Sequence, residues 1–96
     1  MEASMSDSTT KLILNDGTVI DNGKAGYSEG FLWCYITGYT MQQAALLFFD
    51  PAKTGKITFE YGAEQDVYEG FTNCINIHID VDEIIHVCLT RGAENG

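Results

Sequence analysis

Positive charge is scarce in this sequence, which has five Lys and Arg residues against 14 Asp and Glu residues and a formal net charge of −9 over 96 residues. An excess of negative charge repels nucleic-acid phosphates and anionic membrane surfaces. We therefore expect no direct nucleic-acid binding and no membrane binding. No apolar run approaches the roughly 20 residues of a membrane-spanning helix. The polar opening MEASMSDSTT does not have the pattern of a secretory signal.

Paired cysteines are also missing, because Cys34, Cys74 and Cys88 are odd in number and form no CxxC motif. Small secreted domains that depend on disulfides carry an even set of cysteines. We therefore expect reduced thiols and a reducing, cytoplasmic compartment. The sequence also lacks a GxSxG motif, a P-loop and a dinucleotide fingerprint. Nucleophilic catalysis and nucleotide-dependent chemistry of the familiar types are not indicated.

The composition that remains is that of one folded domain, with 45% hydrophobic and 20% charged residues. Residues 1–10 are small, polar and without periodicity, and they predict a flexible N-terminal tail. Residues 11–91 form a single α+β domain in this interpretation. Residues 92–96 are polar and predict a frayed C-terminal tail.

Strand patterns recur through the domain and predict about six or seven short, mostly antiparallel strands. The Asp16-Gly17 pair between two β-prone segments predicts a hairpin. The run FLWCYIT at 31–37 is apolar on both faces, which is typical of a central, covered strand. The glycine-containing segment 21–30 is expected to be a loop. The expected strands are 12–14, 18–20, 31–37, 56–61, 66–71, 74–81 and 84–90.

A single helix is expected between residues 41 and 49. Thr40 and Gln43 have the spacing of a capping box, in which each side chain binds the backbone amide of the other residue. Pro51 disfavours helical geometry at Asp50 and ends the helix before it. The predicted fold is therefore α+β, with a mostly antiparallel sheet and one helix packed on it.

The final hairpin has a register that can be predicted from its alternation. A three-residue loop at 81–83 places the apolar residues of both strands on one face. Loops of this kind usually have glycine at the third position, so we expect strain at Glu83. The expected apolar pairs are Ile79–Ile85, Ile77–Val87 and Ile75–Leu89.

The same register places His78 opposite His86, with Asp80, Asn76 and Cys88 on the same face. Two imidazoles, a thiolate and a carboxylate are ligands that borderline metal ions accept. A plain solvent-facing or partner-facing sheet surface produces the same alternation, and we favour this interpretation. We assign no catalytic residue, no metal ligand and no cofactor. His78, Asp80 and His86 are candidates for contact with a ligand or partner.

Aromatic residues are the other notable excess, with five Phe, five Tyr and one Trp. Most of them are expected in the core. Tyr27, Tyr39 and Tyr68 fall at the ends of strands or in loops, where amphipathic rings often anchor interfaces. We include these three tyrosines among the candidate binding residues.

Several short motifs give the chain a resemblance to a known group. They are Leu-x-Leu-Asn-Asp-Gly-Thr at 12–18, Asp-Pro-x-Lys-Thr at 50–54, the strand 57–61, Tyr-Glu-Gly-Phe-Thr at 68–72 and the Ile-rich final hairpin. Over residues 11–91 the chain resembles small accessory proteins of tailed phages and prophages of gut Firmicutes. The resemblance implies a viral accessory protein that acts in the virion or against the host.

Three functions follow from these observations, in order of preference. The first is a phage-encoded, non-enzymatic inhibitor of a host defence component, which binds a protein surface or sequesters a small signalling molecule in the host cytoplasm. The second is a minor virion protein of the tail or head. The third is a small metal-binding protein or enzyme that uses the face of His78, His86 and Cys88. A homo-oligomer is expected in each case, because a small sheet with apolar faces has edges and surface to cover.

Overall fold

The computed structural model describes residues 9–92 of the chain. The expected tails therefore lie outside the described residues, apart from Thr9, Thr10 and Gly92, and Thr10 is the first residue of a strand. The elements are β1 (Thr10–Ile13), β2 (Val19–Asp21), β3 (Lys24–Ser28), β4 (Phe31–Ile36), α1 (Met41–Phe48), α2 (Pro51–Thr54), β5 (Lys56–Tyr61), β6 (Glu64–Glu69), β7 (Asn73–Ile79) and β8 (Ile85–Thr90).

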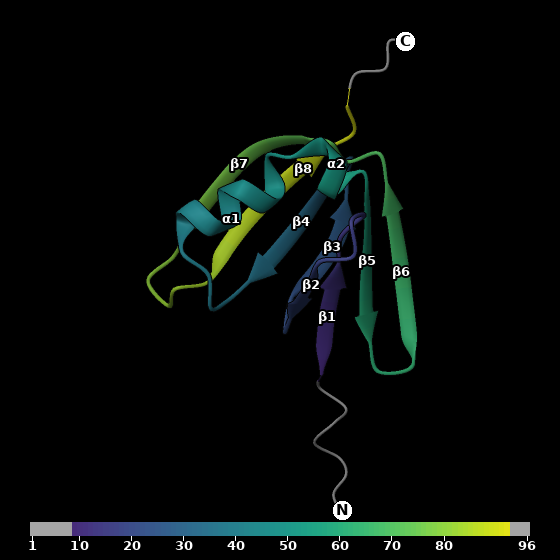
Figure 1. The fold of residues 1–96 in the computed structure, drawn as a ribbon, viewed down its shortest axis with the longest axis horizontal. Helices are drawn as coiled ribbons and strands as arrows, with labels where there is room; N and C mark the ends of the chain where they lie inside the picture. Colours follow the sequence, from purple (N-terminus) through teal and green to yellow (C-terminus); the bar gives the residue numbers. More distant parts are fainter. Residues whose placement is uncertain (1–8, 93–96) are drawn as a thin grey trace, which may run out of the picture.

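The strands form two four-stranded sheets with the orders β2-β1-β5-β6 and β3-β4-β8-β7 (Figure 1). Every pairing between neighbouring strands is antiparallel. The α+β, mostly antiparallel architecture is thus as expected. The finer prediction was wrong in two respects: the described residues contain eight strands in two sheets, and a second short helix, α2, follows the first.

The additional strand is β3, which lies in the segment 21–30 that we expected to be a loop. Glu29 and Gly30 both have positive φ, 52° and 88°, and form a two-residue turn that pairs Ser28 with Phe31. Positive φ at both central residues is the geometry of a type I′ hairpin turn, which usually contains Asn-Gly or Asp-Gly. Glu-Gly does not carry that signal, so the hairpin was missed.

The second helix replaces an expected turn at 51–55. The side chain of Asp50 caps it by accepting a hydrogen bond from the amide of Ala52 at 3.0 Å. The β1–β2 loop also holds it, because the Asn15 amide donates to the Lys53 carbonyl at 2.9 Å. An ion pair of 2.6 Å joins Lys53 to Asp16. Proline at the first helical position is compatible with this short helix, because that position needs no donor.

The helix α1 begins as predicted. Thr40 Oγ1 accepts from the Gln43 amide, and Gln43 Oε1 accepts from the Thr40 amide, both at 3.0 Å. The helix ends at Phe48, and its buried residues are Ala44 and Phe48. It packs against β7 and β8, and Figure 1 shows it lying across these strands.

One hydrophobic core connects the two sheets and the helix. Each sheet contributes alternate residues from the face that it turns inward. The fully buried members include Leu12, Ile20 and Ile57 of the first sheet, Leu32, Cys34, Ile36, Ile85, Val87 and Leu89 of the second, and Ala44, Phe48 and Phe71. The opposite face of the second sheet is called the outer face below.

The strand β4 is central in its sheet, between β3 and β8, as predicted. The expectation that both of its faces are covered was wrong. Cys34 and its neighbours on the inner face are buried, whereas Trp33 and Tyr35 on the outer face are only half-buried. No second layer lies over the outer face within the described residues, so aromatic side chains remain accessible there.

The predicted register of the final hairpin is confirmed near the turn. Ile79 lies opposite Ile85, Ile77 opposite Val87, and His78 opposite His86. Glu83 has φ 65°, as the three-residue loop requires. Farther along, the expected pair of Ile75 and Leu89 was wrong. A bulge between Cys74 and Asn76 shifts the register and places Cys74 opposite Leu89, because a bulge adds one unpaired residue to one strand.

Candidate functional site

A row of side chains crosses all four strands of the second sheet on its outer face. Lys24 of β3 pairs with Tyr35 of β4, Tyr35 pairs with His86 of β8, and His86 pairs with His78 of β7. Because directly opposed residues on neighbouring strands project from the same face, a cation, a phenol and two imidazoles lie side by side. We call these four residues the outer row.

His86 is the most constrained member of the outer row. Its Nε2 lies 2.7 Å from Oδ2 of Asp80. Its ring meets the Tyr35 ring edge-on, with centroids 5.1 Å apart, and stacks on the His78 ring at 4.8 Å with an angle of 3° between the planes. Three neighbours on three sides therefore hold the imidazole in one orientation.

Asp80 holds the turn and the histidine together. Its Oδ1 accepts hydrogen bonds from the amides of Asp82 at 2.8 Å and Ile84 at 3.0 Å, while Oδ2 binds His86. The hydrogen bond from His86, followed by that from the Ile84 amide, lowers the pKa of the Asp80 carboxyl. Asp80 is therefore an anion at neutral pH, and its carboxylate accepts the hydrogen bond of the His86 ring.

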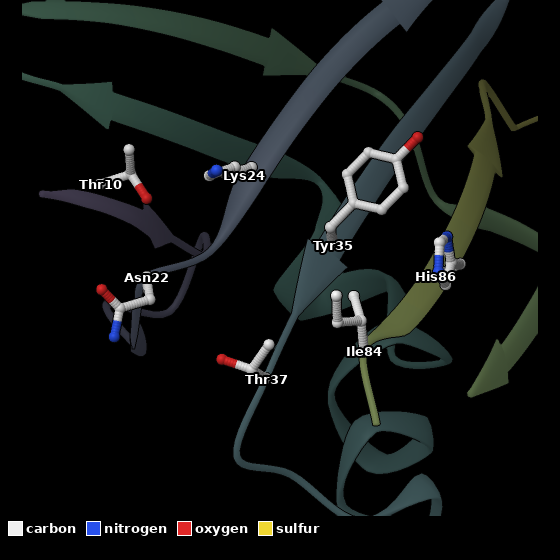
Figure 2. Close-up of a pocket in the computed structure, with 7 residues that line it drawn as sticks. All are labelled: Thr10, Asn22, Lys24, Tyr35, Thr37, Ile84 and His86. Carbon is white, nitrogen blue, oxygen red and sulfur yellow. The ribbon is translucent and has the colours of Figure 1, made fainter. Parts of the chain in front are cut away.

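A pocket of about 420 Å³ opens beside the outer row (Figure 2). Its walls come from both sheets, because the chain passes from β2 to β3 at the edge of the pocket. Asn22 in this connection donates its backbone amide to the Thr10 carbonyl at 2.8 Å, which fixes that wall. The lining residues are Thr10, Asn22, Lys24, Tyr35, Thr37, Ile84 and His86.

The charge of the pocket lining differs from that of the whole chain. No carboxylate lines it, although the chain has 14 of them. Lys24 contributes a positive charge and belongs to neither of the ion pairs found between residues 9 and 92, which are Lys53–Asp16 and His86–Asp80. The volume lies within the range of small-molecule sites, about 300–1,000 Å³. The lining thus offers a cation, hydrogen-bonding groups and an aromatic ring in a space that a small molecule can fill.

The structure brings together three of the six predicted binding residues. His78, Asp80 and His86 meet on the outer face, as the register predicted. The tyrosines lie elsewhere. Tyr27 and Tyr68 both pack edge-on against Phe71, with centroid distances of 5.8 and 6.3 Å. Tyr39 packs against the hydrophobic core. None of the three lines the pocket.

Metal ligation and thiol chemistry were the third possibility that the sequence raised. Among residues 9–92, no three His, Cys, Asp or Glu side chains are grouped to hold a metal ion. Cys88 is buried, and burial raises the pKa of its thiol. Burial likewise raises the pKa of Cys34. A thiol with a raised pKa is a poor nucleophile at neutral pH.

Lys24 and Tyr35 are the residues that sequence analysis missed at this site. Lys24 was placed in a loop, and Tyr35 on a strand face that we expected to be covered. The pairing of Lys24 with Tyr35 depends on the turn at 29–30. This pairing could have been predicted from the alternation of Phe31, Trp33 and Tyr35, if the segment before the turn had been interpreted as a strand.

The fold and the site are interpreted from their own residues, because no comparison identifies a related protein. In the part of the chain that the structure describes, no helix is both long and apolar enough to cross a membrane. No protein-family model, no curated protein and no solved structure matches this chain.

Proposed function

We propose that the protein is a phage-encoded, non-enzymatic binding protein that inhibits a host defence component by sequestering a small signalling molecule in the pocket beside the outer row. The phage origin rests on the sequence resemblance of residues 11–91, and the host cytoplasm is the proposed place of action. The observation that carries the binding function is the pocket itself, with its volume of about 420 Å³ and a lining that contains no carboxylate.

Tight sequestration is favoured by a site that is ordered before the ligand binds, and two features of the pocket fit this. Asp80 and Tyr35 fix the orientation of His86. Lys24, Tyr35 and His86 project from paired strands rather than from mobile loops. A preformed site loses less conformational entropy on binding than a site that must be ordered.

The test is native mass spectrometry of the purified chain after incubation with the small-molecule fraction of a host extract. Wild type should carry a stoichiometric adduct of small mass. Thr37→Trp places a large ring at the exposed rim of the pocket and should abolish the adduct. Gln65→Trp, on the exposed strand β6 away from the pocket, is the matched control and should retain it. A wild-type chain without an adduct would contradict the proposal. The same spectra measure the proposed homo-oligomer directly.

The pair of Asp80 and His86 favours a second candidate, an enzyme that uses His86 as a general acid or base. An imidazole oriented by a carboxylate at 2.7 Å and lining a pocket has the arrangement that proton transfer needs. The two candidates differ in the fate of the bound molecule. A sequestering protein returns its ligand unchanged after denaturation, whereas an enzyme returns a product of different mass.

A further inference from the structure

We infer that the pocket takes a small organic anion that carries a planar ring, of the mononucleotide type, with its phosphate at Lys24 and its ring against Tyr35. This inference rests on the proposed binding function and names its ligand class. It is carried by the composition of the outer row and by the absence of carboxylates from the pocket lining.

Lys24 supplies the positive charge of the pocket lining. Its ammonium group is the one formal cation in the lining, and the side chain is exposed on the edge strand β3. Asp80, the carboxylate that binds His86, also accepts hydrogen bonds from two backbone amides and does not line the pocket. An anionic ligand would pair with this ammonium group, and a cationic ligand would be repelled by it.

The aromatic ring of the pocket is that of Tyr35, which lies between Lys24 and His86 in the outer row. Opposed Cα atoms on neighbouring antiparallel strands are about 4.5–5.5 Å apart, so the Cα atoms of Lys24 and His86 are separated by about 10 Å. An anionic group at the lysine and a planar ring at the tyrosine fit within this span. Aromatic side chains bind planar rings by stacking.

The polar residues at the sides of the pocket complete the match. Asn22 offers an amide with both donors and acceptors, and Thr10 and Thr37 offer hydroxyl groups. Figure 2 shows these three side chains on the side of the pocket away from His86. A sugar or the polar edge of a base would find partners there, whereas a purely hydrophobic ring would leave them unpaired.

The overall charge of −9 opposes this ligand at long range, but salt restricts the effect. Exposed charges farther away than the Debye length of about 8 Å are largely screened at physiological ionic strength. The groups that line the pocket therefore dominate the final approach. This also restricts the ligand to a small anion, because a long polyanion such as RNA would extend over the acidic surface.

The experiment is calorimetric titration of the full chain with AMP, GMP, CMP and UMP, with adenosine and inorganic phosphate as partial ligands. At least one nucleotide should bind more tightly than either partial ligand. Lys24→Met should weaken that binding by about tenfold or more, and Tyr35→Leu should remove the preference for the nucleotide over phosphate. Lys56→Met is the matched control, because it removes the same charge from an exposed strand position outside the pocket and should change the affinity less than about twofold.

The outcomes separate this inference from the proposed function. If adenosine binds as tightly as AMP, or if Lys24→Met leaves the affinity unchanged, the inference that the ligand is an anion held by Lys24 is wrong. If phosphate binds as tightly as every nucleotide, the inference that a ring of the ligand contacts Tyr35 is wrong. If no nucleotide binds while the host extract still gives an adduct that Thr37→Trp abolishes, the ligand class is wrong and the binding function stands. If the extract gives no adduct either, the binding function fails as well.

Discussion

Glu83 occupies in the last hairpin the position that Gly17 occupies in the first. Both residues are third in a three-residue loop and both have positive φ, 65° and 93°. The hydrogen bonds match too: the Gly17 amide donates to Leu14 at 2.9 Å, and the Glu83 amide donates to Asp80 at 3.0 Å. One chain thus contains the favourable and the strained form of the same turn.

This comparison predicts that Glu83→Gly stabilises the protein. A side chain with a Cβ atom loses about 1 kcal/mol in the left-handed region relative to glycine, and the substitution removes that loss. Gly17→Ala should destabilise by a similar amount. Urea denaturation of the two variants and the wild type measures both changes. A lower midpoint for Glu83→Gly would mean that the glutamate side chain makes a compensating contact.

The stability of the protein should depend on pH through the carboxyl group of Asp80. Its pKa is lowered in the folded state, chiefly by the hydrogen bond from His86. The stabilisation is therefore fully present above the ordinary carboxyl pKa of 3.8 and is lost as the pH falls through the lowered folded value. We expect wild type to lose more stability between pH 6 and pH 2.5 than Asp80→Asn does. Asp82→Asn, two residues away, should behave as wild type in the same denaturation series.

A substitution of the buried residue Thr54 should stabilise the protein. Its side chain is fully buried, and its hydroxyl oxygen has no hydrogen-bond partner among the described residues. Thr54→Val keeps the shape and removes the unpaired polar group, which should stabilise by about 1 kcal/mol. Thr54→Ser keeps the hydroxyl, deletes a buried methyl group and should destabilise. Thermal unfolding of the pair distinguishes the two effects, and a destabilised valine variant would show that the hydroxyl has a partner.

Gly23 lies at a position where a side chain does not fit. A Cβ atom there would lie 2.9 Å from Cγ of Leu12, whose side chain is fully buried. Gly23→Ala should therefore destabilise by about 1–3 kcal/mol. Gly26→Ala, in the strand β3 that follows Gly23, is the control, because its Cβ would meet nothing within 4 Å. Chemical denaturation should show a large loss for the first and almost none for the second. Equal effects would mean that backbone flexibility matters more than space.

The parts of the fold that sequence analysis predicted correctly depend on strong local rules. The capping box of Thr40 fixes the start of α1 at Met41, and parity fixes the pairs of β7 with β8 near the turn. The errors occur where local signals are weak. The Glu29-Gly30 turn concealed β3, and a bulge at Ile75 moved the far end of the hairpin out of register. The grouping of His78, Asp80 and His86 followed from parity, but their meeting with Lys24 and Tyr35 depends on the order of strands from distant parts of the chain.

That strand order also sets when the site can form. The strands β4 and β8 pair with each other although residues 37–84 lie between them in sequence. On the ribosome, Tyr35 is synthesised long before His86, so the edge of β4 that pairs with β8 has no partner until the last strand has emerged. Closing a loop of this length is slow compared with forming a local hairpin. The pocket is therefore a late product of folding, and a chain cut short before β8 lacks both part of its core and the imidazole of its site.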